Sequence, residues 1–311
     1  MAQSLALGAV SQKYWNNSKL KHGENKVRIG QHNRRFAKRL QIFNLAVSKF
    51  TDFLTAKFTQ KTNHNGGERS PEMQGSTFIA PYYLNLPTQV DWRSLGAVTP
   101  VRQQSSNQSC GSCWAFATAG ALEGQHFRKT GNLIPLSPQN LIDCSARYGN
   151  RGCDGGSMAK SIDFIKHNGG LATEQSYPYR NVQGECQHRS ATIGATSSGF
   201  VKLPYGDEKK LAEAVASIGP IYVSIDGSQE SFLNHKSGIY EDPKCSSSIQ
   251  KAGQIHDVLI VGYGTDPATG KDYWLVKNSW GTDWGENGYI RMIRNANNHC
   301  GIASFARYPL V

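Results

Sequence analysis

The sequence predicts an α+β fold in which helices come before strands, behind a basic helical leader. Helical patterns are expected at 114–130, 157–167 and 207–218, since the first is Ala-rich and each one ends at or near a glycine. After Pro220, apolar and β-branched runs predict strands at 221–225, 258–261, 273–277 and 288–293. This segregation of helices from strands favours α+β over an alternating α/β architecture.

The leader carries most of the positive charge of the chain. Residues 1–85 contain 13 Lys or Arg and 4 Asp or Glu, whereas residues 86–311 contain 21 and 19. Residues 24–43 interleave apolar residues with basic and amide residues and predict a helix, and residues 60–85 are dense in Asn, Gly, Ser and Pro and predict an exposed linker. A disordered basic arm is the alternative. Because no nucleic-acid-binding motif accompanies the charge, we expect no nucleic acid partner.

The chain of 311 residues is long enough for two domains of ordinary size. Its first residues hold a short apolar run at 4–10 that no Lys or Arg precedes, so a degenerate signal peptide at 1–12 is one interpretation. The sequence has no run of 18 apolar residues, and we expect no membrane span.

The seven cysteines give the first indication of chemistry. Cys110 and Cys113 form a C-x-x-C pair, but zinc would need a second pair, and a redox motif would need a βαβ unit. We therefore expect neither metal nor cofactor. An odd count in an oxidising compartment leaves one thiol outside the bridges. Cys113 stands at the start of the Ala-rich helix, where the helix N-terminus stabilises an anion, and is the candidate nucleophile.

A nucleophilic cysteine needs a base, and the base needs an orienting partner. His256 stands at the head of the apolar strand 258–264, and Asn278 follows the strand 272–277. Either residue alone is more often a structural polar group. Together with Cys113 they predict a nucleophile, a base and an orienting amide.

These residues resemble the papain family of cysteine peptidases, and within it the cathepsin L branch. The run Cys110-Gly111-Ser112-Cys113-Trp114 matches the family signature, and His256 follows Cys113 within the expected span of about 130 to 150 residues, with Asn278 somewhat beyond it. The resemblance covers nearly everything after Leu86, and its matching stretches include 86–87, 90–93, 120–131, 136–144, 273–281 and 299–303.

The resemblance implies a papain-like fold of two lobes with a substrate cleft between them. A helical lobe at about 97–199 would carry Cys113, and a β-barrel-like lobe at about 200–305 would carry His256 and Asn278. Residues 1–85 would be an inhibitory pro-segment and residues 86–311 the peptidase domain. The implied disulfides pair Cys110 with Cys153, Cys144 with Cys186, and Cys245 with Cys300.

The implied function is that of a cysteine endopeptidase made as a latent zymogen. Cys113 would attack the peptide carbonyl, His256 would protonate the leaving amine, and Asn278 would hold the imidazole under the cover of Trp280. No His-bearing insertion of the kind that blocks the cleft in carboxydipeptidase relatives is present, which favours endopeptidase action. The expected partners are protein and peptide substrates, the chain's own pro-segment and protein inhibitors of such peptidases. We expect a monomer that is lysosomal or secreted.

The chain departs from the family pattern around the active site. The segment before Cys110 carries about three extra residues. Gln104 matches the oxyanion glutamine of the family when the alignment is made from the residues before it, and Gln108 is the nearest match from the residues after it. Gln104 is favoured, because the extra residues can loop out after it. Asp257 stands where the family has a small residue, and its carboxylate would stabilise a charged His256 or crowd the substrate. The implied substrate pocket is apolar but shallow and is lined by Gly155, Gly156, Met158, Ser224, Asp257 and Phe305.

The leader departs from the pattern as well. Asn25, Ile29 and Asn33 match the last three positions of the pro-region motif of cathepsin L-like zymogens. Tyr14, Ser18 and His22 stand where its Glu, Arg and Phe are expected. Ser48 stands where a second motif usually has Asn. Because the leader is basic, we expect it to dock partly on acidic groups and to loosen as those carboxylates are protonated. The alternative function is a non-catalytic or weakly active papain-like protein that binds peptides.

Overall fold

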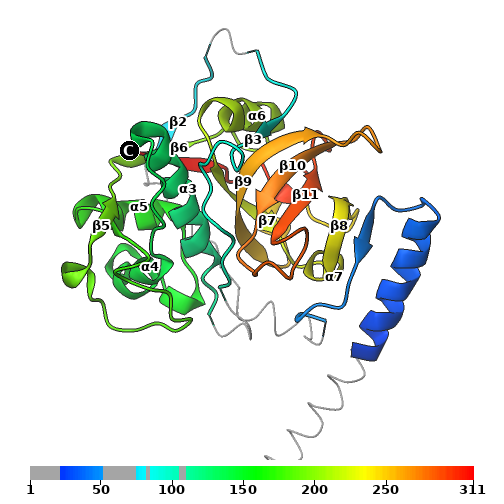
Figure 1. The fold of residues 1–311 in the computed structure, drawn as a ribbon, viewed down its shortest axis with the longest axis horizontal. Coiled ribbons are helices and arrows are strands. Elements are labelled where there is room, and N and C mark those ends of the chain that lie inside the picture. Colours follow the sequence, from blue (N-terminus) through cyan, green and yellow to red (C-terminus); the bar gives the residue numbers. More distant parts are fainter. Residues whose placement is uncertain (1–21, 52–74, 82–84, 105–109) are drawn as a thin grey trace, which may run out of the picture.

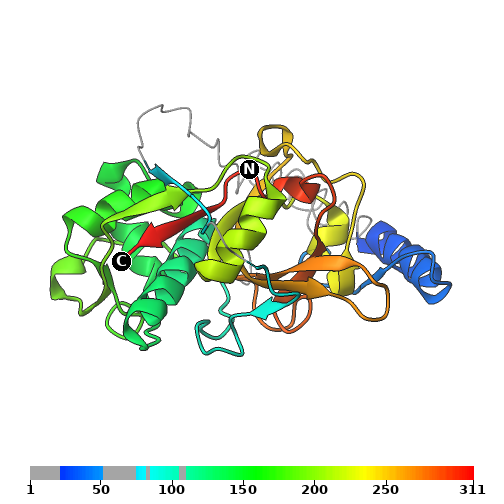
Figure 2. The same cartoon turned by 90° about the horizontal axis from the view of Figure 1, so that it is seen from above.

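The chain folds into a helical lobe and a β-rich lobe, and residues 22–51 lie on the side of the β-rich lobe away from the helical lobe (Figures 1 and 2). This computed structural model describes residues 22–51, 75–81, 85–104 and 110–311. We use helical lobe for the elements from α3 to β5, and β-rich lobe for those from β6 to β12 together with β3.

The helical lobe is built from three helices: α3 (Cys113–Thr130), α4 (Pro138–Cys144) and α5 (Met158–His167). Helix α3 ends at Gly131, whose φ of 76° suits a residue without a Cβ. The hydroxyls of Ser137 and Ser157 accept hydrogen bonds from the first turns of α4 and α5. Two short strands pair beside these helices, β4 (Leu171–Ala172) and β5 (Ile193–Ala195). Three 3-10 turns complete the lobe: Ala146–Tyr148, Gly152–Asp154 and His188–Ser190.

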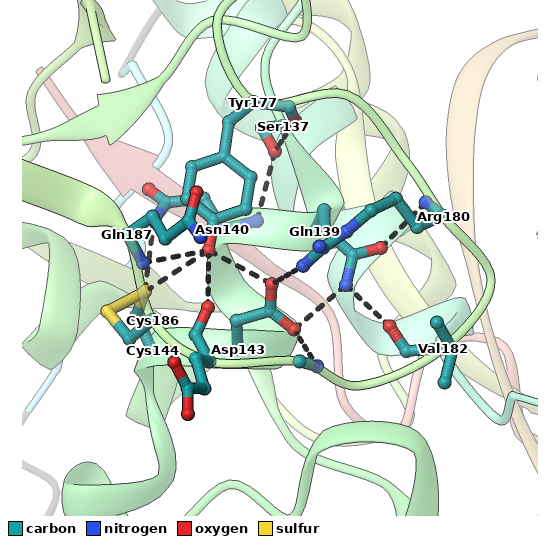
Figure 3. Close-up of polar contacts among 12 residues, drawn as sticks. Ser137, Gln139, Asn140, Asp143, Cys144, Tyr177, Arg180, Val182, Cys186 and Gln187 are labelled. Atoms are coloured by element: carbon teal, nitrogen blue, oxygen red, sulfur yellow. Dashed lines mark hydrogen bonds and ion pairs between the residues drawn. A yellow bond between two sulfur atoms is a disulfide. The ribbon is translucent and has the colours of Figure 1, made fainter. Parts of the chain in front are cut away.

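A bonded network ties the loop after β4 to helix α4 (Figure 3). The buried carboxylate of Asp143 accepts hydrogen bonds from Gln139 Nε2, Tyr177 Oη and the amide of Gly184, and forms an ion pair with Arg180 at 2.7 Å. The Cys144–Cys186 disulfide lies in the same network. This segment is thus fixed by side chains rather than by regular secondary structure.

The β-rich lobe centres on a ten-stranded sheet of order β1-β8-β11-β10-β9-β7-β12-β6-β2, with β3 paired to β9. Helices α6 (Glu208–Ser217) and α7 (Glu230–Leu233) and two 3-10 turns, Ile249–Lys251 and His299–Gly301, accompany it. The strands are β1 (Phe43–Leu45), β2 (Ser76–Thr77), β3 (Val90–Asp91), β6 (Gly199–Lys202), β7 (Ile221–Asp226), β8 (His235–Tyr240), β9 (Ile255–Thr265), β10 (Asp272–Lys277), β11 (Tyr289–Ile293) and β12 (Arg307–Leu310).

The predicted elements of residues 114–293 agree with these bounds within a few residues. The largest difference is β9, which begins at Ile255 and therefore includes His256 itself. One buried apolar cluster lies within the β-rich lobe. A second joins α3, α4 and α5 to residues of the sheet, because α3 packs on β7, β9 and β12. Cys113 at the start of α3 therefore faces the strand that carries His256.

The first described segment of the leader has a helix at 22–37 followed by strand β1 (Phe43–Leu45), and β2 lies in a later described segment. The prediction of one helix over 24–43 is wrong beyond residue 37. The chain turns at Arg39, whose φ is 58°, and Phe43 then pairs with Gly238 of β8 in an antiparallel ladder. Gly238 permits this approach, because a Cβ on it would lie 2.3 Å from the carbonyl oxygen of Ile42.

Candidate active site

Cys113 is the first residue of α3 and is 1% exposed. Its neighbour Cys110 is bonded to Cys153, and the other two bridges join Cys144 to Cys186 and Cys245 to Cys300. These are the pairs that the family resemblance implies. Of the seven cysteines, all within the described residues, Cys113 alone keeps a thiol. The amide dipoles at the start of the long helix α3 favour negative charge at its sulfur.

His256 is held by an amide and covered by an aromatic ring. Its Nε2 lies 2.8 Å from Oδ1 of Asn278, which also accepts a hydrogen bond from the amide of Ser279 at 2.8 Å. The Trp280 indole stacks on the imidazole with ring centroids 4.6 Å apart. Because His256, Asn278 and Trp280 are each at most 3% exposed, the His256–Asn278 hydrogen bond is shielded from water. The arrangement fixes the ring orientation and leaves Nδ1 as the nitrogen available to another partner.

Several groups act on the charge of Cys113. In the full chain, burial raises the pKa of its thiol and the carboxylate of Asp257 raises it further. Hydrogen bonds from the backbone amides of Asp257 and Trp114 lower the same pKa. An imidazolium at His256 would also favour the thiolate.

Gln104 lies beside the residues that follow Asn278. Its side-chain Oε1 accepts a hydrogen bond from Ser279 Oγ at 2.6 Å, and its backbone N–H donates to the backbone carbonyl of Ser279 at 2.7 Å. The Tyr179 hydroxyl donates to the carbonyl of Gln104 and also lies 2.9 Å from Ser112 Oγ, one residue before Cys113. Gln108, the alternative oxyanion residue, lies outside the described residues.

The residues predicted to line a substrate pocket come from both lobes. In the helical lobe, a Cβ on Gly156 would lie 2.6 Å from the indole of Trp114, so the ring requires glycine there, and Gly155 precedes it at a φ of 120°. Met158 is fully buried at the start of α5.

In the β-rich lobe, Ser224 Oγ donates to Asp257 Oδ1 at 2.6 Å. The two polar side chains of the predicted pocket are therefore bonded to each other, and the pocket itself stays a prediction. Phe305 is half-buried against Tyr205 and the guanidinium of Arg307.

The leader reaches this site directly. The ring of Phe50 packs on Trp280 with centroids 4.5 Å apart, and Lys49 Nζ donates to the carbonyl of Trp280 at 2.7 Å. Thr51 Oγ1 and Ser48 Oγ both donate to Oδ1 of Asn234. The indole that covers His256 is thus itself covered by the leader.

The motif residues of the leader support this docked segment. Asn25 Nδ2 donates to the carbonyl of Thr51, and the Asn33 side chain exchanges two hydrogen bonds with the backbone of Leu45. Ile29 is buried in the core of the β-rich lobe. Arg28 and Glu230 form an ion pair across the interface at 2.7 Å, with side chains 59% and 27% exposed. Docking of the leader is therefore stabilised by apolar contacts and backbone pairing, and the exposed ion pair adds only a modest electrostatic contribution.

Sequence reasoning missed several residues around the site. Ser279 is adjacent to Asn278, and its position beside the predicted orienting amide was a usable signal. Tyr179 and Tyr222 carry no local signal, because each contacts the site only through the tertiary fold. Within the described segments no helix is long and apolar enough to span a membrane, and no three His, Cys, Asp or Glu side chains form a potential metal site.

The sequence model of papain family cysteine proteases matches residues 86–310. Cathepsin L1 of Drosophila melanogaster is 48% identical over 100% of this chain and 88% of its own length, and human cathepsin L2 is 46% identical over 93% and 84%. The structure of digestive procathepsin L 3 from the larval midgut of Tenebrio molitor is similar, with a TM-score of 0.83 and 38% identity over 96% of this chain and 92% of that one.

Proposed function

Because this chain belongs to the papain family of cysteine proteases and is a cathepsin L-like endopeptidase made as a proenzyme, we propose that Cys113, His256 and Asn278 carry its reaction. The observation that carries this assignment is the shielded 2.8 Å contact between His256 Nε2 and Asn278 Oδ1. His256 lies on β9, which packs on the helix that begins at Cys113, the only free cysteine among the described residues.

The proposed reaction is acyl transfer in two steps. The Cys113 thiolate attacks the carbonyl carbon of the substrate, and His256 as imidazolium gives its Nδ1 proton to the amine as the C–N bond breaks. In the second step His256 takes a proton from water, whose oxygen attacks the thioester and releases the acid and Cys113. Asn278 accepts from Nε2–H throughout, so the imidazole keeps the tautomer and orientation that both steps need.

We propose Gln104 as the side-chain donor of the oxyanion hole. Ser279 Oγ donates a hydrogen bond to Oε1 of Gln104, so the N–H groups of the same side-chain amide point away from Ser279. The backbone amide of Cys113 would supply the second donor. Two donors aimed at the developing oxyanion stabilise it most where water is excluded.

We further propose that residues 1–85 act as an inhibitory pro-segment of the peptidase domain 86–311. In that domain the helical lobe would span about 97–199 and the β-barrel-like lobe about 200–305. The packing of Phe50 on Trp280 supports this, since substrate would have to share that surface. Activation would follow autocatalytic cleavage between Asn63 and Leu86. A lysosomal or secreted site of action agrees with acid-dependent removal of the leader. We propose action on protein and peptide substrates as a monomer, with protein inhibitors of papain-like peptidases as further partners.

The test is cleavage of internally quenched peptides of graded length by acid-processed protein. We expect cleavage within long peptides and its loss in His256→Ala, while His188→Ala, a histidine bonded in the helical lobe, retains it. Peptide binding without cleavage by the unaltered protein would instead identify the alternative function, a peptide-binding relative. Cleavage by His256→Ala at the unaltered rate would contradict the assignment.

A further inference from the structure

Strand β2 attaches a late segment of the leader to the edge of the main sheet, beside β6 (Figure 1). The two strands pair in parallel, and the backbone N–H of Phe78 donates to the carbonyl of Lys202 at 2.8 Å. Phe78 is 5% exposed, whereas Thr77 before it is exposed and Ile79 after it is 88% exposed. The segment 75–80 is therefore held by its backbone and by a single large side chain.

The two faces of β6 fit this segment in different ways. On one face, Phe78 joins Val201 in the buried cluster of the β-rich lobe, and its ring lies edge-on to Tyr308 with centroids 6.4 Å apart. Gly75 lies three residues earlier and therefore on the other face. There a Cβ on Gly75 would lie 2.5 Å from the ring of Phe200. The seat thus selects a glycine and, three residues later, an aromatic ring.

Removal of the leader would uncover this seat. Strand β6 has β12 on one side, and among the described residues β2 is the only strand on its other side. The proposed peptidase domain 86–311 lacks β2, so backbone N–H and C=O groups of β6 would lose their partners there. The apolar surface beneath Phe78 would open at the same time. A sheet edge beside an apolar pocket is a recurring site for the binding of extended peptides.

We propose that removal of the leader uncovers a docking site for an extended segment of a protein substrate, which adds a strand to the edge of β6 and places an aromatic side chain where Phe78 lies. The inference deepens the proposed function, since it assumes an endopeptidase whose leader is removed. Only two positions of the segment are restricted, so many unfolded segments would fit. A long substrate bound here is held near the active site, which raises its effective concentration there.

The binding test uses a fluorescent synthetic peptide of residues 75–81 as the probe and follows its anisotropy. The protein is the Cys113→Ala chain, cut by a trace of processed enzyme or, if that enzyme proves inactive, by an added protease. Mass spectrometry confirms that residues 75–81 have left the purified product. We expect saturable binding to the cut protein and at least about tenfold weaker binding to the uncut chain, in which β2 occupies the site.

Three substitutions in the probe test the fit. Phe78→Ala removes the aromatic ring and should weaken binding by about tenfold or more. Gly75→Val places carbon atoms against the ring of Phe200 and should weaken binding as well. Ile79→Ala is the matched control, because that side chain is 88% exposed, and it should bind as the unaltered probe does. Equal binding of the Phe78→Ala probe and the unaltered probe, or no saturable binding at all, would overturn the proposal.

A kinetic measurement identifies the occupant. With active processed enzyme, the unlabelled probe should slow the cleavage of an unfolded protein such as casein and leave the cleavage of a short quenched peptide unchanged. Equal slowing of both would place the probe in the active site and overturn the proposal.

Two further outcomes would also overturn it. A processed enzyme that forms a dimer, which the probe dissociates, would make a second copy the occupant. A mature chain that begins before Gly75 and keeps β2 would leave no site to fill. Failure of the proposed function would appear separately, as a processed protein that binds the probe and cleaves no short peptide.

Discussion

Ser279 and Gln104 are joined twice, once between side chains at 2.6 Å and once between backbones at 2.7 Å. Ser279 follows Asn278, so the residue that orients the candidate oxyanion glutamine is covalently next to the residue that orients the imidazole. The two halves of the active site are thereby fixed to a single backbone segment.

Replacing Gln104 by Ala should lower kcat by about 100- to 1,000-fold with little change in KM, because the donor is needed mainly for the developing oxyanion. Steady-state kinetics of processed protein on a small peptide substrate measures this. Gln103→Ala, which alters an exposed neighbour, is the control. A normal kcat in Gln104→Ala would show that another residue supplies the donor.

Replacing Phe50 by Ala should weaken latency, since the ring is 3% exposed and packs on Trp280. Loss of this apolar contact costs about 2 kcal/mol, which corresponds to a roughly 30-fold weaker docking of the leader. We expect unprocessed Phe50→Ala at neutral pH to react faster with a thiol-directed epoxide. Val47→Ala changes an apolar leader residue that is already 52% exposed and should react as the unaltered chain does. Equal rates in both variants would mean that Phe50 does not hold the leader.

His235 should make leader docking sensitive to acid. The ring is 2% exposed beneath Phe43 of β1, and neither ring nitrogen has a hydrogen-bond partner among the described residues. Burial, with Arg291 and His32, lowers its pKa from 6.5 to about 3. Because the docked state keeps this ring neutral, docking requires no proton release above pH 6.5 and must release a proton below it, which opposes the docked state. Acidification from pH 6.5 toward 3 should therefore weaken docking by up to tenfold per pH unit, as the ring regains water when β1 departs.

The measurement is cleavage of an inactive Cys113→Ala chain by a trace of processed enzyme, with and without the further change His235→Phe. The ratio of the two rates at each pH cancels the pH dependence of the enzyme itself. We expect the ratio to be near one at pH 7 and to favour the histidine chain increasingly toward pH 4.5, and His126→Gln, distant on α3, to show no such trend. A ratio independent of pH would exclude His235 as the sensor and leave the acidic partners of the leader, such as Glu230, to account for activation.

Removing the Cys144–Cys186 bridge by changing both residues to Ala should reduce stability before it reduces catalysis. The bridge joins residues 42 apart in sequence, and its loss costs roughly 3 to 4 kcal/mol in the chain-entropy description. Denaturant unfolding of processed protein measures the loss, and Val182→Ala, an exposed residue of the same loop, is the control. An unchanged free energy of unfolding would mean that the Asp143 network alone holds this segment.

Local signals in the sequence were sufficient for most of the regular structure. Gly131 ends α3, and the side chains of Ser157 and Asp207 cap the starts of α5 and α6. Such caps involve residues only a few positions apart, so the sequence alone reveals them. The strands after Pro220 follow from their apolar and β-branched runs. By contrast, Phe43 lies in a strand only because β8 offers it an edge, and nothing within the leader encodes that pairing.

In the candidate site too, some features follow from local sequence and others only from tertiary contacts. Cys113, His256 and Asn278 could be proposed from residue type and position in their elements, and the choice between Gln104 and Gln108 from where extra residues can loop out. The hydrogen bond between Ser224 and Asp257 could not be predicted, because it depends on the register of β7 against β9. The contact of Tyr179 with Gln104 joins residues that only the packing of two loops brings together.

The central claim is that Cys113 is the nucleophile of a cysteine endopeptidase, and the most direct test is the site of alkylation. Acid-processed protein is incubated with an epoxide that alkylates activated cysteines, and the adduct is located by peptide mass spectrometry while peptide cleavage is followed in parallel. The account predicts one adduct, on Cys113, formed in proportion to the loss of cleavage, and strongly slowed in His256→Ala. Loss of cleavage without label on Cys113, or appreciable cleavage by pure Cys113→Ala protein, would contradict it.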